Sequence, residues 1–172
     1  QAGFMMLGFV NSDALGMNTL VYFMLIYSLS NLAVFGVMSI VVNATGKENM
    51  DDFNGFYSTN PGLSLIMLLA LFSLAGIPPV AGFFGKFFLF TAAASKGMYI
   101  LVFIAVLNAT VSLYYYLMVV KAMFINKNET PIPALTSTGY EKLALSICFI
   151  GIIVIGFLSA VYAYIESVVG LS

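Results

Sequence analysis

Charged side chains are scarce in this sequence of 172 residues, and several residue types are missing altogether. Only 8% of the residues are charged, against about 25% in a typical globular domain. All basic residues are lysines, and there is no arginine, histidine or tryptophan. With six lysines and a formal net charge of −1, the chain lacks the clustered basic face that binds nucleic-acid phosphates. We therefore exclude a nucleic acid as partner.

The same absences limit metal and disulfide chemistry. Cys148 is the single cysteine and lies in an apolar run, so the chain has no disulfide framework and no cysteine-based metal site of its own. Its residue type and surroundings favour a small buried hydrophobe. Without histidine the usual ligand sets are missing, and neither a phosphate loop nor a nucleophile triad is present. We expect this chain to hold no metal and no redox cofactor.

Long apolar runs fill the chain instead. Apolar residues make up 62% of the sequence, and the mean hydropathy is +1.05. A helix that crosses a bilayer needs about 20 such residues. The runs predict an all-α, polytopic membrane protein, a transmembrane helix bundle with the end of one helix at 1–10 and further helices at about 17–42, 62–94, 98–120 and 143–165.

The sequence starts at Gln1, within an apolar segment and without a charged leader. A secretory signal peptide is therefore not expected. We interpret residues 1–172 as the C-terminal transmembrane region of a longer subunit whose N-terminal part is absent.

The run at 62–94 is too long for one straight crossing. About 30 residues of helix would measure roughly 45–50 Å, whereas the hydrocarbon core is about 30 Å thick. Pro78 and Pro79 each remove an amide donor and clash with the preceding turn, and Gly76 and Gly82 flank them. The pattern predicts two half-helices joined by an unwound hinge at Gly76–Gly82. Broken backbone at this depth is tolerated only inside protein or beside a polar cavity.

Lys86 follows this hinge in the middle of the apolar run, and the nearest charged residues along the chain are Asp52 and Lys96. Ionisable residues inside a membrane cost about 2.5–3.5 kcal/mol on insertion scales and usually mark ion or proton pathways. The alternative, a lysine that snorkels to the interface, is disfavoured because eight almost wholly apolar residues follow before Ser95. A desolvated lysine can exchange a proton near neutral pH. Lys86 is our candidate proton-relay residue.

The other polar side chains within the spans are small. Most are expected to join helices to one another or to bond their own backbone. The alternative is that some of them line a hydrated path to Lys86. The candidates for such a path are Ser73, Asn108, Ser112 and Tyr115.

The lysines also predict an orientation. Four lie in loops or at span ends on one side of the membrane and one lies on the other, and by the positive-inside rule the lysine-rich side is cytoplasmic. The C-terminus then lies outside: in the periplasm of a bacterium, the location we favour, or in the intermembrane space of a mitochondrion. The four lysines are Lys47, Lys121, Lys127 and Lys142, and the single one is Lys96.

Three stretches carry a resemblance to a known family. SLAGIPPVAGFFGKFFLF at 73–90 closely resembles the broken-helix motif of the antiporter-like subunits of respiratory complex I, a motif shared with Mrp-type sodium/proton antiporters and membrane-bound hydrogenases. NLAVFGVMSIV at 31–41 and SLYYYLMVVKAMF at 112–124 are similar to the flanking helices of the N-type subunits. The opening QAGFMMLGF resembles the end of an earlier helix of those subunits.

The resemblance implies a fourteen-helix subunit with two inverted repeats, each containing one broken helix. This chain would extend from the end of the tenth helix through the fourteenth. Lys86 falls on the motif lysine that the family uses as the last proton-relay residue towards the periplasm. Gln1 stands where many members have histidine, so protons would pass that position without a titratable group or by way of water.

The expected function is that of a proton-translocating membrane subunit of NADH:quinone oxidoreductase. By resemblance, this chain would be a non-redox part of the enzyme, with FMN, iron–sulfur clusters and a quinone held by other subunits. The antiporter-like subunit M, the small subunits K and J and the lipid bilayer would be its partners. One alternative is a subunit of an Mrp-type cation/proton antiporter or a membrane-bound hydrogenase. A second is a purely structural membrane subunit in which Lys86 is a satisfied buried charge.

Overall fold

The computed structural model describes residues 1–10 and 14–157, and every regular element within them is helical. The elements are α1 (Ala2–Val10), α2 (Ala14–Thr45), the 3-10 helix η1 (Met50–Phe53), α3 (Phe56–Thr59), α4 (Pro61–Ala75), α5 (Ala81–Ser95), α6 (Tyr99–Phe124) and α7 (Gly139–Phe157). The all-α prediction is confirmed. The end of the helix predicted at 143–165, together with Glu166 and the C-terminus, lies outside the described residues.

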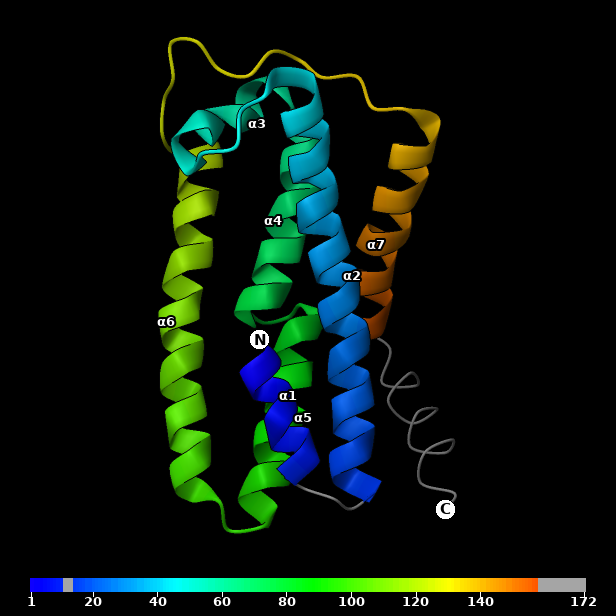
Figure 1. Ribbon diagram of the computed structural model, residues 1–172, viewed down its shortest axis with the longest axis vertical. Coiled ribbons are helices and arrows are strands. Elements are labelled where there is room, and N and C mark those ends of the chain that lie inside the picture. The colour runs from blue at the N-terminus through cyan, green and yellow to red at the C-terminus, as the bar shows by residue number, and fades with distance from the viewer. Residues whose placement is uncertain (11–13, 158–172) are drawn as a thin grey trace.

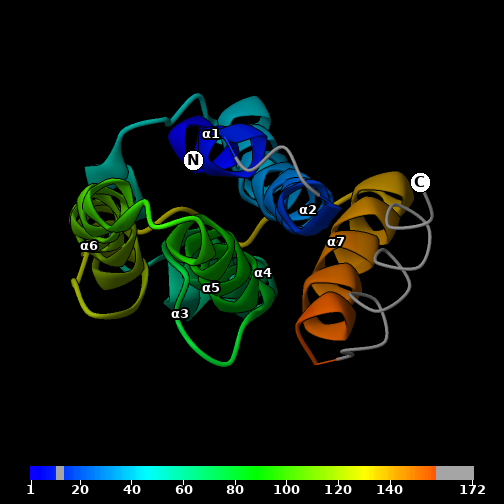
Figure 2. The ribbon, with the colours of Figure 1, turned by 90° about the horizontal axis from the view of Figure 1, so that it is seen from below.

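The helices form a bundle around α2. This helix packs against α1, α4, α5 and α7. In Figure 1, α4 and α5 follow one another end to end through the middle of the bundle, with α1 beside α5. The view along the bundle in Figure 2 places α6 on one side of the α4–α5 pair and α7 on the other side, next to α2. Among the described residues, the α4–α5 pair is therefore flanked by helices on three sides, and its fourth side is open (Figure 2).

Membrane-spanning length separates these helices into two groups. Among the described residues, α2, α6 and α7 are long and apolar enough to cross a membrane, judged by length and composition. Both α4 and α5 have 15 residues, which gives each a length of about 22 Å, short of a core about 30 Å thick. Only the two stacked together can cross. The predicted broken helix is confirmed, with its interruption between Ala75 and Ala81.

Most helices run beyond the apolar runs that predict them. The second span extends from Ala14 to Thr45, past the predicted limits of 17–42 on both sides. The helix expected at 98–120 continues to Phe124, so that Lys121 lies in its last turn. A cation there interacts favourably with the partial negative charge of the helix C-terminus. Helix ends are thus set by capping and charge as well as by hydropathy.

The start of α4 is fixed by the polar loop between α6 and α7. The Asn60 side chain donates to the carbonyl of Pro133 at 3.0 Å and accepts from the Leu135 amide at 2.8 Å. The Gly55 amide donates to the Ala122 carbonyl at 3.0 Å. This loop and the short helices η1 and α3 cover one end of the bundle (Figure 1). One end of α4 is therefore held by hydrogen bonds, and its other end is the break.

Candidate functional site

The break begins with a glycine in the left-handed conformation. Gly76 has a φ of +82°, which costs glycine little because it has no Cβ. Its amide nitrogen lies 3.1 Å from the Ser73 carbonyl oxygen, and the Ile77 amide nitrogen lies 3.0 Å from that of Phe72. These two bonds form the Schellman motif that ends many helices. Gly76 thus stops α4, and two of its last carbonyls are satisfied.

The next two carbonyls of α4, those of Leu74 and Ala75, lose their usual donors to the double proline. In a continuous helix each carbonyl accepts from the amide four residues later, which here would be Pro78 and Pro79. Proline has no N–H to donate. The sequence therefore frees two adjacent carbonyl oxygens at the end of α4.

Lys86 of α5 binds both of these oxygens. Its Nζ donates to the Leu74 carbonyl at 2.8 Å and to the Ala75 carbonyl at 3.0 Å, and the residue is only 5% exposed. The C-terminal end of a helix carries about half a negative charge, and lysine side chains stabilise such ends by bonding the last carbonyls. Lys86 therefore caps α4 across the break.

An aromatic ring covers another side of the ammonium group. Lys86 Nζ lies 5.0 Å from the ring centroid of Phe4, on α1, within the range of about 6 Å for a cation–π interaction. The Phe4 ring packs edge-on against Phe23 and Phe90, with centroids 6.5 Å and 5.8 Å away. In the described part of the chain, Nζ is thus held by two carbonyls and a ring, with no carboxylate among these partners.

Both glycines singled out from the sequence lie where the backbone has no room for a side chain. A Cβ at Gly76 would lie 3.0 Å from Cδ and 3.5 Å from Nζ of Lys86. A Cβ at Gly82 would collide with the backbone carbonyl of Ser73. Gly76 therefore leaves space for the lysine, and Gly82 allows the start of α5 to pack directly on the end of α4.

Gln1 shares an acceptor with the lysine. Its Nε2 lies 2.6 Å from the Leu74 carbonyl oxygen and 3.2 Å from the hydroxyl of Tyr116 on α6. A carbonyl oxygen has two lone pairs, so the Leu74 oxygen can accept from Gln1 and Lys86 together. Gln1 thus connects α1, α4 and α6 at the break.

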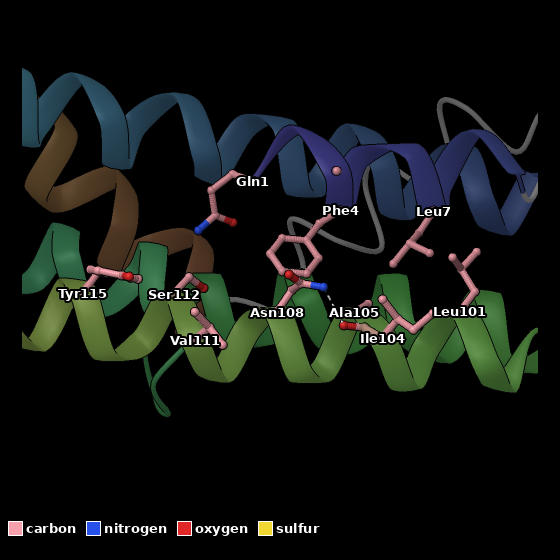
Figure 3. Close-up of a pocket in the computed structure, with 11 residues that line it drawn as sticks. Gln1, Phe4, Leu7, Leu101, Ile104, Ala105, Asn108, Val111, Ser112 and Tyr115 are labelled. Atoms are coloured by element: carbon pink, nitrogen blue, oxygen red, sulfur yellow. Dashed lines mark hydrogen bonds between the residues drawn. The ribbon is translucent and has the colours of Figure 1, made fainter.

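Two spaces adjoin the site. A cavity of about 10 Å³, room for about one water molecule, adjoins Gln1, Leu74 and the hydroxyls of Ser30 and Ser73, which are hydrogen-bonded to each other at 2.8 Å. A groove of about 460 Å³ lies between α1 and α6, with Gln1, Phe4 and Leu7 facing α6 across it (Figure 3). Gln1 lines both spaces.

The candidate path residues divide between these two spaces. Ser73 lines the small cavity, whereas Asn108, Ser112 and Tyr115 line the groove (Figure 3). Asn108 donates to the Ile104 carbonyl at 2.8 Å and Ser112 to the Ala109 carbonyl at 2.9 Å, both within α6. Each keeps an oxygen that can accept a further bond. A continuous hydrated path through them to Lys86 stays a prediction.

Several groups at the site went unrecognised in the sequence. From the sequence no role is assigned to Phe4, Tyr116 or the two carbonyls, and Gln1 is distinguished only by the absence of a titratable group. Gln1 and Phe4 are three residues apart, a spacing that places them on one face of a helix, and this was the available signal. A proline four residues after each free carbonyl was the signal for the lysine's partners.

Metal-binding groups do not gather in the part of the chain that the structure describes. Among residues 1–10 and 14–157, no three histidine, cysteine, aspartate or glutamate side chains are grouped so that they could hold a metal ion. Cys148 is a buried thiol in α7. Among the described residues, the groups bonded at the break are therefore the Lys86 amine, the Gln1 amide, hydroxyls and backbone carbonyls.

A helical membrane bundle with a lysine at the break of a discontinuous helix is typical of antiporter-like membrane subunits. The comparisons with known proteins agree. Residues 1–112 match the family described as NADH:quinone oxidoreductase/Mrp antiporter, transmembrane. The chain belongs to this family and is an integral membrane protein.

The relatives indicate which type of subunit within the family the chain resembles. The chain is 52% identical over 170 residues to NADH-quinone oxidoreductase subunit N of Azobacteroides pseudotrichonymphae, covering 98% of this chain and 35% of that protein. It is 51% identical over 163 residues to subunit N of Phocaeicola vulgatus, covering 94% and 34%. The resemblance to the N-type subunits is confirmed.

A solved structure shares the fold. Respiratory complex I from Thermus thermophilus with bound aureothin contains a chain with a TM-score of 0.78 and 30% sequence identity, a match that covers 92% of this chain and 36% of that one. This chain therefore spans about a third of the length of the curated relatives it matches.

Proposed function

We propose that this chain is part of a proton-translocating membrane subunit of NADH:quinone oxidoreductase and that Lys86 relays protons within it. The observation that carries the proposal is the Lys86 ammonium bound to the free carbonyls of Leu74 and Ala75 at the break. FMN, the iron–sulfur clusters and the quinone belong, in this proposal, to other subunits. This chain supplies a proton site and its coupling to the helices around it.

The carbonyl pair suits a group that gains and loses a proton. A protonated lysine has three N–H groups and a neutral amine has two, so either form can donate to both Leu74 and Ala75. The charged form gains in addition from the helix C-terminus and from the Phe4 ring. Lys86 can therefore change its charge while α4 keeps its cap, and a charge that arrives nearby can shift the balance between the two forms.

The proposed orientation of the chain in the membrane follows from the distribution of its lysines. The loops after α2 and after α6 meet at one end of the bundle, and the short connection between α5 and α6 lies at the other (Figure 1). We assign the first end to the cytoplasm of a bacterium by the positive-inside rule. It bears Lys47, Lys121, Lys127 and Lys142, whereas Lys96 follows α5 at the opposite end. The C-terminus is assigned to the periplasmic side.

Neighbouring membrane subunits are the proposed partners. Because α6 is apolar and little of it is buried within the described residues, it presents a face to lipid or to other helices. Subunit M and the small subunits K and J are the proposed neighbours, on the resemblance to N-type subunits.

An Mrp-type antiporter is the second candidate, because the matched family description includes Mrp antiporters. The names of the relatives favour the quinone oxidoreductase. Purification of the full-length subunit from its own membranes separates the candidates. Isolation within a redox complex supports the first, and isolation as a stable antiporter with no redox complex in the same membranes supports the second.

Substitution of Lys86 in the full-length subunit tests the relay. Lys86→Met keeps the volume and removes the proton site, so NADH-driven proton uptake into vesicles and NADH:quinone turnover, both measured per assembled complex, should fall by about tenfold or more. Lys86→Arg should restore little, since a guanidinium hardly deprotonates. Lys127→Met, at an exposed loop position, is the matched control. A Lys86→Met complex that pumps at the wild-type rate and stoichiometry would mean that the lysine is structural.

A further inference from the structure

The ring of Phe4 contributes an interaction that the two carbonyls cannot. We propose that Phe4 is a positioning residue for Lys86: its ring stabilises the ammonium form and separates the lysine from the groove between α1 and α6. This inference rests on the relay function proposed for Lys86, and it assigns to α1 a part in setting the protonation state of that lysine.

The ring distinguishes the two proton states of the lysine. Phe4 is 7% exposed, and its centroid is 5.0 Å from Nζ of Lys86. A ring quadrupole attracts a cation, most strongly where water is excluded, but it offers a neutral amine little. The carbonyls of Leu74 and Ala75 accept N–H groups from either form. The preference for the charged form therefore depends in part on the ring.

No carboxylate among the described residues stabilises the ammonium form of Lys86 in place of the ring. The acidic residues of the described chain lie in the polar segment after α2, in the loop after α6 and in the first turn of α7. These segments are at the end of the bundle, away from the break (Figure 1). They are Glu48, Asp51, Asp52, Glu129 and Glu141. The Tyr116 hydroxyl is connected to the lysine's acceptor through Gln1, which bonds both that hydroxyl and the Leu74 carbonyl.

The position of the ring is fixed from two sides. Phe23 of α2 and Phe90 of α5 meet it edge-on, which is a favourable geometry for aromatic pairs. One turn earlier on the same helix face, Gln1 donates to the Leu74 carbonyl that Lys86 also binds. Because α1 is tied to the lysine's own acceptor, the distance from ring to ammonium is set locally.

The ring also stands between the lysine and the groove. Phe4 lines the groove together with Asn108 and Ser112 (Figure 3), whereas Lys86 lines neither the groove nor the small cavity among the described residues. Phe4 contacts Nζ and Gln1 shares its Leu74 acceptor, so these two groove-lining side chains are the expected route of a proton from the groove to Nζ. The ring thus limits the access of groove water to the lysine.

Substitutions that remove or keep the ring test the proposal. In the full-length subunit within its assembled complex, Phe4→Leu keeps an apolar side chain without a ring, and Phe4→Tyr keeps the ring. Proton uptake into membrane vesicles and NADH:quinone turnover, both normalised to assembled complex, should fall about two- to tenfold in Phe4→Leu. Phe4→Tyr should stay near the wild-type rate. Phe56→Leu removes another buried ring with an edge-on partner, Phe53, in the short helices α3 and η1 at the end of the bundle away from the break, and should pump normally per assembled complex.

Two results would overturn the inference: wild-type pumping by Phe4→Leu, or an equal loss in Phe4→Leu and Phe4→Tyr, which would point to packing alone. If Phe4→Leu does not assemble, Phe4→Met takes its place with the same expectations, because its unbranched, flexible side chain adapts to an irregular space. Lys86→Met separates this inference from the relay itself. Normal pumping by Lys86→Met refutes the relay, whereas loss in Lys86→Met with normal pumping in Phe4→Leu refutes only the role of the ring.

Discussion

Replacing Gly82 with alanine is expected to push the two halves of the broken helix apart. The added Cβ would collide with the carbonyl of Ser73 and lie 3.0 Å from its Cα. These are backbone atoms, so no flexible side chain can move aside. Because non-bonded carbon atoms prefer separations of about 3.5–4.0 Å, the start of α5 must move away from α4 by about 1 Å.

That displacement acts directly on the lysine. Nζ of Lys86 is 2.8 Å and 3.0 Å from its two acceptors, and a further 1 Å or so exceeds the distance at which a hydrogen bond forms. A hydrogen bond to a charged group contributes about 1.5–3 kcal/mol, and overpacking a core costs about 1–3 kcal/mol. We expect Gly82→Ala to destabilise the break by about 3 kcal/mol or more.

The assay compares two alanine variants of the full-length subunit. Gly62 lies in the first turn of α4, where an added Cβ meets no atom within 4 Å, so Gly62→Ala is the matched control and should behave like wild type. Gly82→Ala should lower the amount of assembled complex on native gels and the proton uptake per assembled complex. Equal assembly and pumping in the two variants would refute the close approach of α5 to the end of α4.

Two further substitutions test the supports of the site. Gln1→Leu removes the donor to the Leu74 carbonyl and the Tyr116 hydroxyl, so proton uptake should fall a few-fold in assembled complex while Gln1→Asn retains part of the rate; equal rates in Gln1→Leu and wild type would contradict the anchoring of α1. Asn60→Ala leaves the Pro133 carbonyl and the Leu135 amide without their partner, and should cost about 1–3 kcal/mol. This loss of stability would be measured as a lower thermal midpoint of the detergent-solubilised complex. An unchanged midpoint would contradict the role of Asn60 in holding the loop between α6 and α7 against the start of α4.

The break could be predicted from the sequence because its causes are local. The length of the apolar run, Gly76 and the double proline sufficed, and the interruption lies where they indicated. The partners of Lys86 follow from the same residues by one more step. Pro78 and Pro79 withhold the amide donors from Leu74 and Ala75, and these are the carbonyls that the lysine binds.

The contributions of α1 and α6 could not be predicted in the same way. Phe4 meets a lysine more than 80 positions later in the chain, and only the packing of helices determines such a contact. The three consecutive tyrosines of α6 point in different directions, since each residue turns the helix by about 100°. Tyr115, the candidate that the sequence offers, lines the groove, whereas the Tyr116 hydroxyl accepts a hydrogen bond from Gln1.

A lysine held by neutral groups responds to a neighbouring charge more readily than one in an ion pair. A cap at a helix C-terminus contributes about 0.3–2 kcal/mol, and a cation–π contact about 0.5–2 kcal/mol. A unit charge that arrives 4 Å away changes the energy of the ammonium by about 4 kcal/mol at an effective dielectric constant of 20. An incoming charge therefore outweighs either of the local contacts that favour the ammonium. A carboxylate at the same distance would stabilise the ammonium by as much as an incoming positive charge destabilises it, and would therefore cancel the effect of that charge. The free carbonyls that the double proline creates thus hold Lys86 in place and leave its protonation state open to control by its neighbours.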